Sequence, residues 1–415
     1  ISGNTVRVVE KGLVSGVERI IAQSETGDPS GVLLSAQRHV FQAVAFDVNG
    51  RKEWRSLDYT ITSDLDAVKA LTPGDISVVS VDAAEAKWVV AFTNDSAPVR
   101  YWLWDRKAKA GTFLFSSQPS LDAARLATTS YVSIPSRDGL VLPAYLTLPP
   151  GAAPQSLPLV VLVHGGPWWR DSWGFRGDVQ LLANRGYAVL QVNFRGSTGY
   201  GKRFLNAGNR QWGQAMQNDL DDAVRWAVGQ SLAAPSRVAI MGTSYGGYAT
   251  LAGLAFTPDT FACGVDLAGP SNLFTLLGSI PPYWQTMRAT LLRRMGDPNA
   301  SADKELLTRV SPLFSAQNIR APLLLAQGAN DPRVKVAEAD QMFTALEGKG
   351  LRATYVLYPD EGHGLVRPAN RLDFYARAEA FLATCLGGRA EPLSTGNGSA
   401  PTVRTSPSGK STSRE

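Results

Sequence analysis

The fold of this 415-residue chain is decided by Ser236-Arg-Val-Ala-Ile-Met-Gly-Thr-Ser-Tyr-Gly-Gly-Tyr248. The apolar run 238–241 predicts a buried strand, and the Ala- and Leu-rich segment 248–256 predicts a helix. Between them lies a Gly-x-Ser-x-Gly turn, 242–246. Strand, tight turn and helix are the context in which this motif forms a nucleophile elbow, with Ser244 exposed at the carboxyl end of a sheet. The alternative is a glycine-rich turn without chemistry.

A serine hydroxyl becomes a nucleophile only beside a base, which is usually histidine. The chain contains three histidines, His39, His164 and His363. In α/β hydrolases the histidine follows the serine and the acid along the chain, so only His363 qualifies. It lies in the turn-rich loop 358–364, and such loops carry catalytic groups on rigid scaffolds. A histidine in a loop is often inert, so this assignment depends on the other members of the set.

The acid of the set has to lie between Ser244 and His363. Asp331 follows the apolar run 322–326 and a short turn, which places it just beyond the carboxyl end of another strand. Competing aspartates lie in connecting segments, on a helix, or almost against the histidine: Asp259, Asp297, Asp303, Asp340 and Asp360. Since Asp331 precedes Pro332, the alternative is that it only caps the following helix.

A second glycine-rich segment follows the apolar run 159–163. It reads His164-Gly-Gly-Pro-Trp-Trp169. A Gly-Gly pair directly after a strand lets backbone N–H groups face an anionic oxygen without obstruction by Cβ, which predicts one half of an oxyanion hole. The N–H of Tyr245, just past the nucleophile, predicts the other half. The alternative is a simple Gly-Gly-Pro turn.

Composition is that of a globular protein, with 44% hydrophobic and 19% charged residues. No apolar run approaches the ~20 residues of a membrane-spanning helix. Net charge is +5, but no basic block appears, which argues against a nucleic-acid partner. Cys263 and Cys385 are too few for a disulfide framework or a metal site, and the histidines lack metal-binding spacing, so no cofactor is expected.

The location and assembly of the chain are weakly constrained by the sequence. A cytoplasmic location is expected, and a periplasmic or secreted one if the native amino terminus is missing, because residue 1 is Ile and the absence of a signal peptide therefore proves nothing. A homo-oligomer is left open.

Residues 1–128 are predicted to form β structure. Short runs rich in Val, Trp, Tyr and Phe occur at 78–81, 87–92, 99–104 and 112–115. Four short strands within ~40 residues are typical of one propeller blade. An earlier set is expected at 31–35, 42–47 and 52–57, with Asn49-Gly50 as a hairpin turn. These segments predict a partial β-propeller of two to three blades, with a small β-sandwich as the alternative.

Residues 129–387 change to alternating strands and helices. A hairpin is expected to turn at 137–139, and buried strands are expected at 159–163, 188–192, 237–241, 264–268, 322–326 and 353–357. Helices are expected at 219–228, 337–346 and 370–386. This alternation predicts a doubly wound, mostly parallel sheet of the α/β-hydrolase type. The Ser/Thr/Gly/Pro-rich tail, 388–415, is expected to be disordered.

Five motifs together resemble the prolyl oligopeptidase family of serine peptidases, and among these the acylaminoacyl-peptidase and dipeptidyl-aminopeptidase-like branch. They are HGGP (164–167), NFRGSTGYG (193–201), GTSYGGY (242–248), GANDPRV (328–334) and DEGHG (360–364). The resemblance covers roughly 129–387. It implies an α/β-hydrolase domain behind an amino-terminal propeller that admits only short peptides. The chain departs from the family in keeping under half of the usual propeller length, which puts gating and exopeptidase specificity in doubt.

The resemblance also implies roles for individual residues. Ser244, Asp331 and His363 would be nucleophile, acid and base. Gly166 and Tyr245 would supply the oxyanion N–H groups, and Arg333 would hold a backbone carbonyl of the peptide. No cofactor is implied.

The function expected is therefore hydrolysis of short peptides by a serine peptidase. A carboxylesterase with the same triad is the main alternative, because fold and triad do not fix the leaving group. A third possible function is that of a non-catalytic binding protein. Four apolar residues after the run 264–268 are expected to line a substrate pocket or, alternatively, a core patch: Phe274, Leu277, Tyr283 and Trp284.

Overall fold

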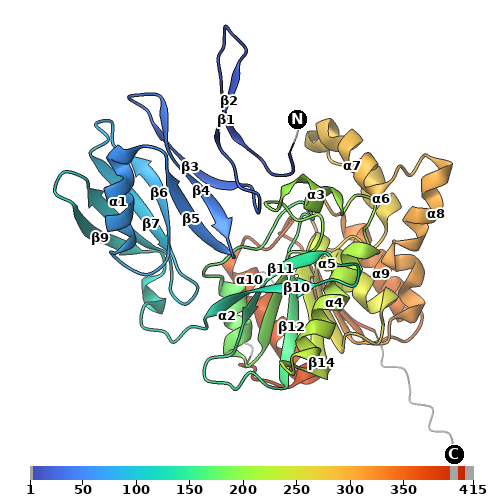
Figure 1. Ribbon diagram of the computed structural model, residues 1–415. Helices are drawn as coiled ribbons and strands as arrows, with labels where there is room; N and C mark the ends of the chain where they lie inside the picture. Colours follow the sequence, from blue (N-terminus) through green and yellow to red (C-terminus); the bar gives the residue numbers. More distant parts are fainter. Residues whose placement is uncertain (1–2, 393–400, 407–415) are drawn as a thin grey trace, which may run out of the picture. The chain divides into compact units, whose positions relative to one another are not determined.

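The computed structural model describes residues 3–392 and 401–406, which form two compact units (Figure 1). The first unit contains the described residues up to 131 together with 172–184 and 198–205, and the second contains the rest. The sequence assigned those two inserted segments to the catalytic domain, and the structure places them in the first unit instead. One reason is Gln180, whose side chain donates to the carbonyls of Asp95 and Ala127 and accepts from the Ala127 N–H.

The first unit contains three antiparallel sheets. Their strands are β1 (Val8–Lys11) and β2 (Glu18–Ala22); β3 (Pro29–Ser35), β4 (Val40–Val48) and β5 (Arg51–Ser56); and β6 (Asp75–Val81), β7 (Lys87–Thr93), β8 (Arg100–Asp105) and β9 (Ala110–Ser116). The turn between β4 and β5 has φ 47° at Asn49 and 75° at Gly50, the left-handed pair that a two-residue hairpin requires. The consecutive pairing of β6 to β9 is the four-stranded meander predicted for a propeller blade.

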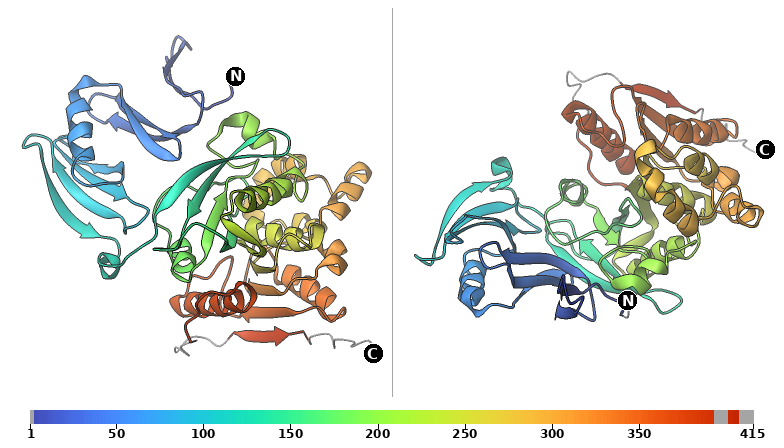
Figure 2. Two further views of the ribbon diagram at one scale, coloured as in Figure 1. Left: turned by 60° about the horizontal axis from the view of Figure 1, so that its bottom comes forward. Right: turned by 90° about the horizontal axis from the view of Figure 1, so that it is seen from above.

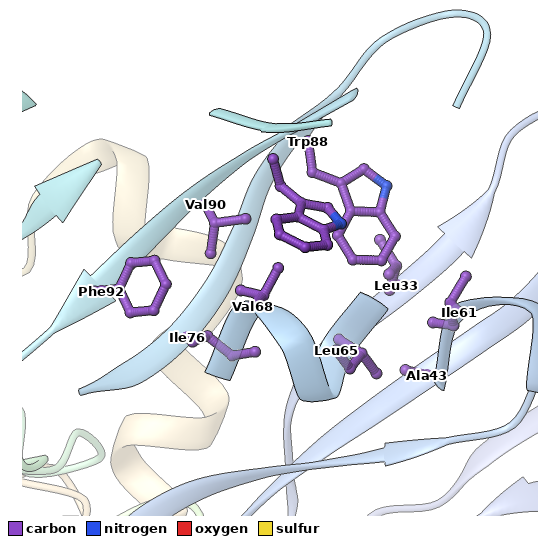
Figure 3. Close-up of a cluster of buried hydrophobic side chains, with 10 residues drawn as sticks. Leu33, Ala43, Ile61, Leu65, Val68, Ile76, Trp88, Val90 and Phe92 are labelled. Atoms are coloured by element: carbon purple, nitrogen blue, oxygen red, sulfur yellow. The ribbon is translucent and has the colours of Figure 1, made fainter. Parts of the chain in front are cut away.

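A helix, α1 (Tyr59–Lys69), packs with these sheets, so the expectation that the first part is all-β is wrong for this segment. Its first N–H groups are capped by Asp58, whose side chain accepts from the Thr60 N–H. Ile61, Leu65 and Val68 recur at helical spacing and are buried. Figure 3 shows these side chains facing Trp88, Val90 and Phe92 in one hydrophobic cluster. The cluster joins the helix to the three- and four-stranded sheets.

The second unit is built on a nine-stranded sheet with the order β10-β11-β13-β12-β14-β15-β16-β17-β18. The strands are β10 (Thr129–Pro135), β11 (Val141–Thr147), β12 (Leu157–Val163), β13 (Ala188–Val192), β14 (Ala233–Thr243), β15 (Cys263–Leu267), β16 (Leu323–Gly328), β17 (Ala353–Tyr358) and β18 (Thr402–Thr405). The strands from β13 to β17 pair in parallel, while β11 is antiparallel to β13 and β18 is antiparallel to β17. Every residue of β13, β15 and β16 is buried, as expected for strands covered on both faces.

Helices alternate with these strands, which confirms the predicted α/β-hydrolase fold. The longer ones are α4 (Ala215–Gly229), α5 (Tyr245–Phe256), α9 (Val336–Glu347) and α10 (Pro368–Leu386). Shorter ones are α6 (Leu273–Gly278), α7 (Arg288–Met295), α8 (Ser301–Arg309) and the 3-10 helices η2 (Pro282–Met287) and η3 (Pro312–Asn318). The 3-10 helix η1 (Pro119–Leu121) and the helices α2 (Gly177–Asn184) and α3 (Gly201–Asn206) lie in segments of the first unit, except for the last residue of α3. Helix α5 packs on β14 and β15, α9 on β16 and β17, and α10 on β14, β15 and β16.

The carboxyl-terminal tail contributes an edge strand to this sheet. Strand β18 pairs antiparallel with β17, with Val403 opposite Val356, and Figure 2 shows it as an arrow along the sheet edge. The Ser406 hydroxyl accepts from the Ala353 N–H, and the Arg404 guanidinium lies 4.5 Å from the Phe343 ring centre. The expectation of disorder is therefore wrong for 402–406, because backbone pairing needs few apolar side chains. The remainder of that prediction, 393–400 and 407–415, lies outside the described residues.

A disulfide joins Cys263 in β15 to Cys385 near the end of α10, with the two Cα atoms 6.4 Å apart. The sequence interpretation, which took two cysteines as too few for a disulfide framework, did not foresee this single bond. Within the described part of the chain, no helix is long and apolar enough to cross a membrane. Within the same residues, no group of three or more His, Cys, Asp or Glu side chains is placed to hold a metal ion.

Candidate active site

Ser244 occupies a sharp turn between the end of β14 and the start of α5. Its backbone has φ 62° and ψ −119°, in the left-handed region that non-glycine residues rarely adopt. The turn requires glycine on both sides: a Cβ on Gly246 would lie 2.1 Å from the Val163 oxygen, and one on Gly242 would lie 2.4 Å from the Gly246 carbon. Strained backbone of this kind is characteristic of functional sites. The geometry is that of the predicted nucleophile elbow.

His363 connects Ser244 to Asp331. Its Nε2 lies 3.0 Å from Ser244 Oγ, and its Nδ1 lies 2.6 Å from Asp331 Oδ2. Because a carboxylate only accepts hydrogen bonds, Nδ1 carries the hydrogen, and Nε2 is left to accept from the serine hydroxyl. The Asp331 side chain is fully buried, and that of His363 is 12% exposed. The structure therefore brings the three residues expected from the sequence, Ser244, His363 and Asp331, into one hydrogen-bonded series.

Asp331 does not cap the following helix, α9, whose N-cap position is Lys335 and has no side-chain cap, so the capping alternative is wrong; Asp331 instead binds the turn that precedes the helix. Its Oδ1 accepts from the backbone N–H groups of Arg333 at 2.8 Å and Val334 at 3.0 Å. The other oxygen, Oδ2, faces His363 and the Gln327 amide, 3.4 Å away. One oxygen of Asp331 therefore holds the turn before α9, and the other faces His363.

The loop that carries His363 is held by a buried carboxylate that the sequence analysis missed. Glu361 accepts hydrogen bonds from the backbone N–H groups of Val366 and Arg367 and from the side-chain amide of Asn370. Its position two residues before the histidine, inside the DEGHG motif, was the available signal. The bonds tie the histidine loop to the start of α10.

Gly166 and Tyr245 lie beside Ser244 in the wall of one cavity. Within residues 3–392 and 401–406, neither backbone N–H donates to a protein acceptor. The Ser244 side chain does not cap α5, so the amino-terminal N–H of that helix is open to a ligand. Two unpaired N–H groups beside a serine oxygen are suited to bind an oxyanion.

The cavity that contains Ser244 has a volume of about 130 Å³ and mostly apolar walls. Its apolar lining includes Trp168, Trp212, Leu276, Leu277, Ile280, Trp284, Met287, Leu291 and Met295. Arg333 also lines it, with its guanidinium carbon 5.6 Å from the Trp284 ring centre, a cation–π distance. Among the lining residues that the structure describes, none carries a carboxylate.

Of the four residues expected to line a substrate pocket, Leu277 and Trp284 line this cavity, whereas Phe274 and Tyr283 do not. Phe274 does not line the cavity and instead makes an edge-on ring contact with Phe314, with centroids 6.2 Å apart. Tyr283 is 57% exposed and does not line the cavity either. Two residues that do line the cavity were not predicted: Trp168, which follows the Gly-Gly-Pro turn, and Trp212, which precedes α4. Both are far from α6 along the chain, so the sequence did not associate them with it.

Behind the nucleophile turn lies a second buried carboxylate, Asp266. Burial raises its pKa to about 8, and the Gly269 N–H opposes this by donating to it at 2.8 Å. A Cβ on Gly247 would lie 2.1 Å from its Oδ1, so this group packs directly against the first turn of α5. It makes no contact with Ser244 or His363 among its recorded bonds and belongs to the scaffold of the turn.

Comparison with known proteins agrees with this geometry. The chain is 51% identical over 397 residues to dipeptidyl aminopeptidase BIII of Pseudoxanthomonas mexicana, covering 94% of this chain and 58% of that protein. It is 43% identical over 362 residues to dipeptidyl peptidase family member 6 of Caenorhabditis elegans, covering 81% of this chain and 49% of that protein. The chain thus spans about half the length of these curated relatives.

A solved structure shares the fold. The puromycin-hydrolyzing peptidase of Mycobacterium tuberculosis superposes with a TM-score of 0.79 at 24% identity, covering 94% of this chain and 60% of that one. Residues 173–389 match the model of the prolyl oligopeptidase family. The match spans more than half of the chain and includes the serine, aspartate and histidine described above. This chain therefore belongs to the prolyl oligopeptidase family.

Proposed function

We propose that this chain is a serine peptidase that hydrolyses short peptides through Ser244, His363 and Asp331. The observation that carries the proposal is the hydrogen-bonded series from Ser244 Oγ through His363 to Asp331, at 3.0 and 2.6 Å. His363 Nε2 takes the hydroxyl proton as Ser244 attacks the peptide carbonyl. Asp331 keeps the imidazole in the required tautomer and stabilises the imidazolium that forms.

The acyl-enzyme then forms and is hydrolysed by the same groups. The N–H groups of Gly166 and Tyr245 bind the tetrahedral oxyanion, and loss of one such donor typically costs ~2.7–4 kcal/mol. His363 gives its proton to the leaving amine, which departs, and then takes a proton from the water that releases the acyl group. The reaction balances without a cofactor.

Arg333 is proposed to hold a backbone carbonyl of the peptide. Its guanidinium lies at the cavity wall over Trp284. The planar set of N–H donors of a guanidinium is suited to bind an oxygen acceptor. A carboxylesterase would use the same triad, but a short ester presents no such carbonyl to Arg333. The printed names of the two similar relatives, both peptidases, also favour the peptide substrate.

The cavity is proposed to receive the side chain that precedes the scissile bond, with preference for a large apolar one. Its volume of about 130 Å³ is close to that of an apolar protein cavity of ~150 Å³ that binds benzene. A phenylalanine or leucine side chain would therefore fill it. A basic side chain would meet apolar walls and the Arg333 guanidinium with no carboxylate to pair with.

A kinetic panel tests the function and this preference together. The substrates are dipeptidyl, acylaminoacyl and aminoacyl amides with Phe, Leu, Gly, Asp or Arg before the scissile bond, beside short acyl esters. We expect kcat/KM to be highest for amides with Phe or Leu. Turnover of esters with no measurable amide hydrolysis would assign the chain to the esterases.

A matched pair of variants locates the side-chain pocket. Leu276→Asp places a carboxylate in the cavity wall, whereas Leu372→Asp makes the same change at an exposed position on α10. We expect Leu276→Asp to lower kcat/KM for the Phe amide at least about tenfold and to raise the Arg-to-Phe ratio, since a pocket contact contributes ~1–3 kcal/mol. Leu372→Asp should change neither. An unchanged ratio in Leu276→Asp would place the substrate side chain elsewhere.

We further infer that the protein works in an oxidising compartment, in place of the cytoplasmic location expected from the sequence. The inference is supported by the Cys263–Cys385 bond, because disulfides persist outside the cytosol and are rare within it. Alkylation of intact cells with a membrane-permeant thiol reagent tests it. Reaction at both cysteines without prior reduction would contradict it.

A further inference from the structure

We propose that Glu338 is a positioning residue that sets the width of the substrate cavity by holding helix α6 against the segment that carries Arg333. This role deepens the proposed function and rests on it, because it concerns the pocket for the side chain before the scissile bond. The sequence analysis did not single out Glu338. It is the third residue of α9 and is only 1% exposed.

The Glu338 carboxylate binds the segment that leads into α6. Its Oε2 accepts from the backbone N–H groups of Ser271 and Asn272, both at 2.9 Å. Its Oε1 accepts from the Thr275 hydroxyl, in the first turn of that helix. The Ser271 hydroxyl donates in turn to the Glu338 backbone carbonyl, at 2.7 Å. The start of α6 is therefore bonded to α9 through both the side chain and the backbone of Glu338.

These two elements are attached to different parts of the cavity wall. Leu276 and Leu277 of α6 line the cavity, and so does Pro270, just before the bonded segment. Arg333 and Val334 also line it, just before the start of α9. The two bonded groups are 67 residues apart along the chain, so tertiary contacts have to fix the distance between these parts of the wall.

Helix α6 depends on such contacts for its position. It has six residues, far fewer than the ~12–15 that an isolated helix needs to be stable in water. A bond from the Leu273 N–H to the Ser311 hydroxyl, at 2.9 Å, attaches it to the residue before η3. That bond does not reach the segment with Arg333. The bonds of Glu338 supply this second attachment.

The acceptors of Glu338 are needed where they are, because the donors they serve are buried. A buried carboxylate costs free energy unless its oxygens are hydrogen-bonded. Burial raises the pKa of the Glu338 carboxyl, and its hydrogen bonds oppose that rise. The Gln341 amide adds a further donor to Oε2, at 2.9 Å. Removing the carboxylate would leave the buried N–H groups of Ser271 and Asn272 without this acceptor, so the start of α6 would have to move to find another.

Two variants of Glu338 separate loss of the bonds from loss of the charge. Leu has a similar volume but accepts no hydrogen bond. In Gln, the amide oxygen takes the place of Oε2 and the NH₂ group donates to the Thr275 hydroxyl, which gives its own hydrogen to the Asn272 carbonyl, 2.9 Å away. We expect Glu338→Leu to lower kcat/KM at least about tenfold for a dipeptidyl amide with Phe before the scissile bond, mainly through KM, since one pocket contact is worth about 10- to 200-fold.

The ratio of kcat/KM for Phe and Gly amides supplies the readout that a merely structural role would not move. A Gly amide has no side chain to reach α6, so its kcat/KM should change less than about threefold in Glu338→Leu. Glu338→Gln should keep the Phe-to-Gly ratio to within about threefold. Thr275→Val, which removes the hydroxyl bonded to Oε1, should lower the ratio by a smaller factor. Rates are expressed per active site by covalent titration, so partial misfolding does not enter.

Glu305→Gln is the matched control. Its side chain is on α8 and is 90% exposed, so the same change there should alter neither kcat/KM nor the Phe-to-Gly ratio. A double variant adds a second control on the mechanism. Leu276→Ala trims the wall of the cavity directly, and its loss on the Phe amide should not add fully to that of Glu338→Leu, because residues that act through one contact are not additive.

The outcomes separate this proposal from the proposed function. Amide hydrolysis by the wild type and its loss in Ser244→Ala decide the peptidase, and Leu276→Asp decides where the substrate side chain lies, both without reference to Glu338. If only esters are hydrolysed, p-nitrophenyl esters of N-acyl-Phe and N-acyl-Gly supply the same ratio. Equal loss on Phe and Gly substrates in Glu338→Leu, or an equal fall of the ratio in Glu338→Gln, would overturn the positioning role. If Glu338→Leu yields no titratable site, Thr275→Val decides, and an unchanged ratio there would overturn the role as well.

Discussion

Replacing Asp331 by Asn exchanges one carboxylate oxygen for an NH₂ group and separates the two roles of this residue. In the wild type, Oδ1 accepts the N–H groups of Arg333 and Val334, and Oδ2 accepts His363 Nδ1–H at 2.6 Å. An Asn side chain has one oxygen, and two backbone donors hold it at the Oδ1 position. Its NH₂ group then faces His363.

This arrangement reverses the tautomer of the imidazole. Nδ1 can bond to an NH₂ group only by accepting, so the hydrogen moves to Nε2, which then cannot take the Ser244 proton. Loss of tautomer control lowers kcat by about 10⁴, equivalent to ~5.4 kcal/mol of transition-state stabilisation. The free energy of unfolding should change by less than about 1 kcal/mol, because the Asn oxygen still accepts from the N–H groups of Arg333 and Val334.

The assay is kcat/KM for a dipeptidyl amide with urea unfolding of the same preparations. Asp259→Asn is the control, since Asp259 is an exposed residue paired only with Arg320 among its recorded bonds. Its activity should match the wild type. Asp331→Asn with more than about a hundredth of wild-type activity would refute the tautomer argument. A nearly unchanged rate in Asp331→Asn would show that Asp331 only holds the turn before α9.

Three further predictions address the substrate, the disulfide and the buried aspartate. Arg333→Ala should lower kcat/KM for dipeptidyl amides roughly 10- to 150-fold, the loss of a ~1.5–3 kcal/mol charged hydrogen bond, and change p-nitrophenyl acetate hydrolysis less than about threefold; equal loss on both would remove Arg333 from peptide binding. The double variant Cys263→Ser/Cys385→Ser should lose up to about 5 kcal/mol in urea unfolding, since the bond closes a loop with a sequence separation of 122; an unchanged midpoint would show that the bond does not form. Burial raises the pKa of Asp266 from 3.8 to about 8, so between these pH values the folded state keeps a proton that the unfolded state releases. The contribution of Asp266 to the free energy of unfolding therefore falls as pH rises from about 4 to about 8. Asp266→Asn should remove this fall, and parallel stability curves from pH 5 to 8 would contradict it.

The fold of the second unit could be predicted because short, continuous stretches of sequence determine its strands, helices and turns. Continuous apolar strands alternate with helices, and the glycines around Ser244 and after the run 159–163 mark turns that only glycine permits. Chain order then selected His363 from the three histidines, and its place beyond the apolar run 322–326 selected Asp331 from the aspartates. Strand and helix pattern, glycine turns and the order of residues along the chain can all be read from the sequence without knowledge of tertiary contacts.

The features that sequence analysis missed depend on contacts between distant segments. The Cys263–Cys385 bond requires the approach of α10 to β15, and β18 depends on backbone pairing with β17. Helix α1 begins with Tyr-Thr-Ile-Thr, residues that also suit a strand, and its packing on Trp88 decides its form. Phe274 was misplaced because the contact with Phe314, not composition, sets where its ring lies.

Ser244 is proposed as the nucleophile of a peptidase. A peptidyl diphenyl phosphonate with Phe at its reactive end tests it directly, by peptide mapping of the adduct alongside the remaining amidase activity. We predict one adduct per chain, on Ser244, with activity falling in step with labelling, and neither labelling nor amide hydrolysis in Ser244→Ala. Complete inhibition with the adduct on another residue, or amide hydrolysis by Ser244→Ala above about a hundredth of wild type, would contradict it.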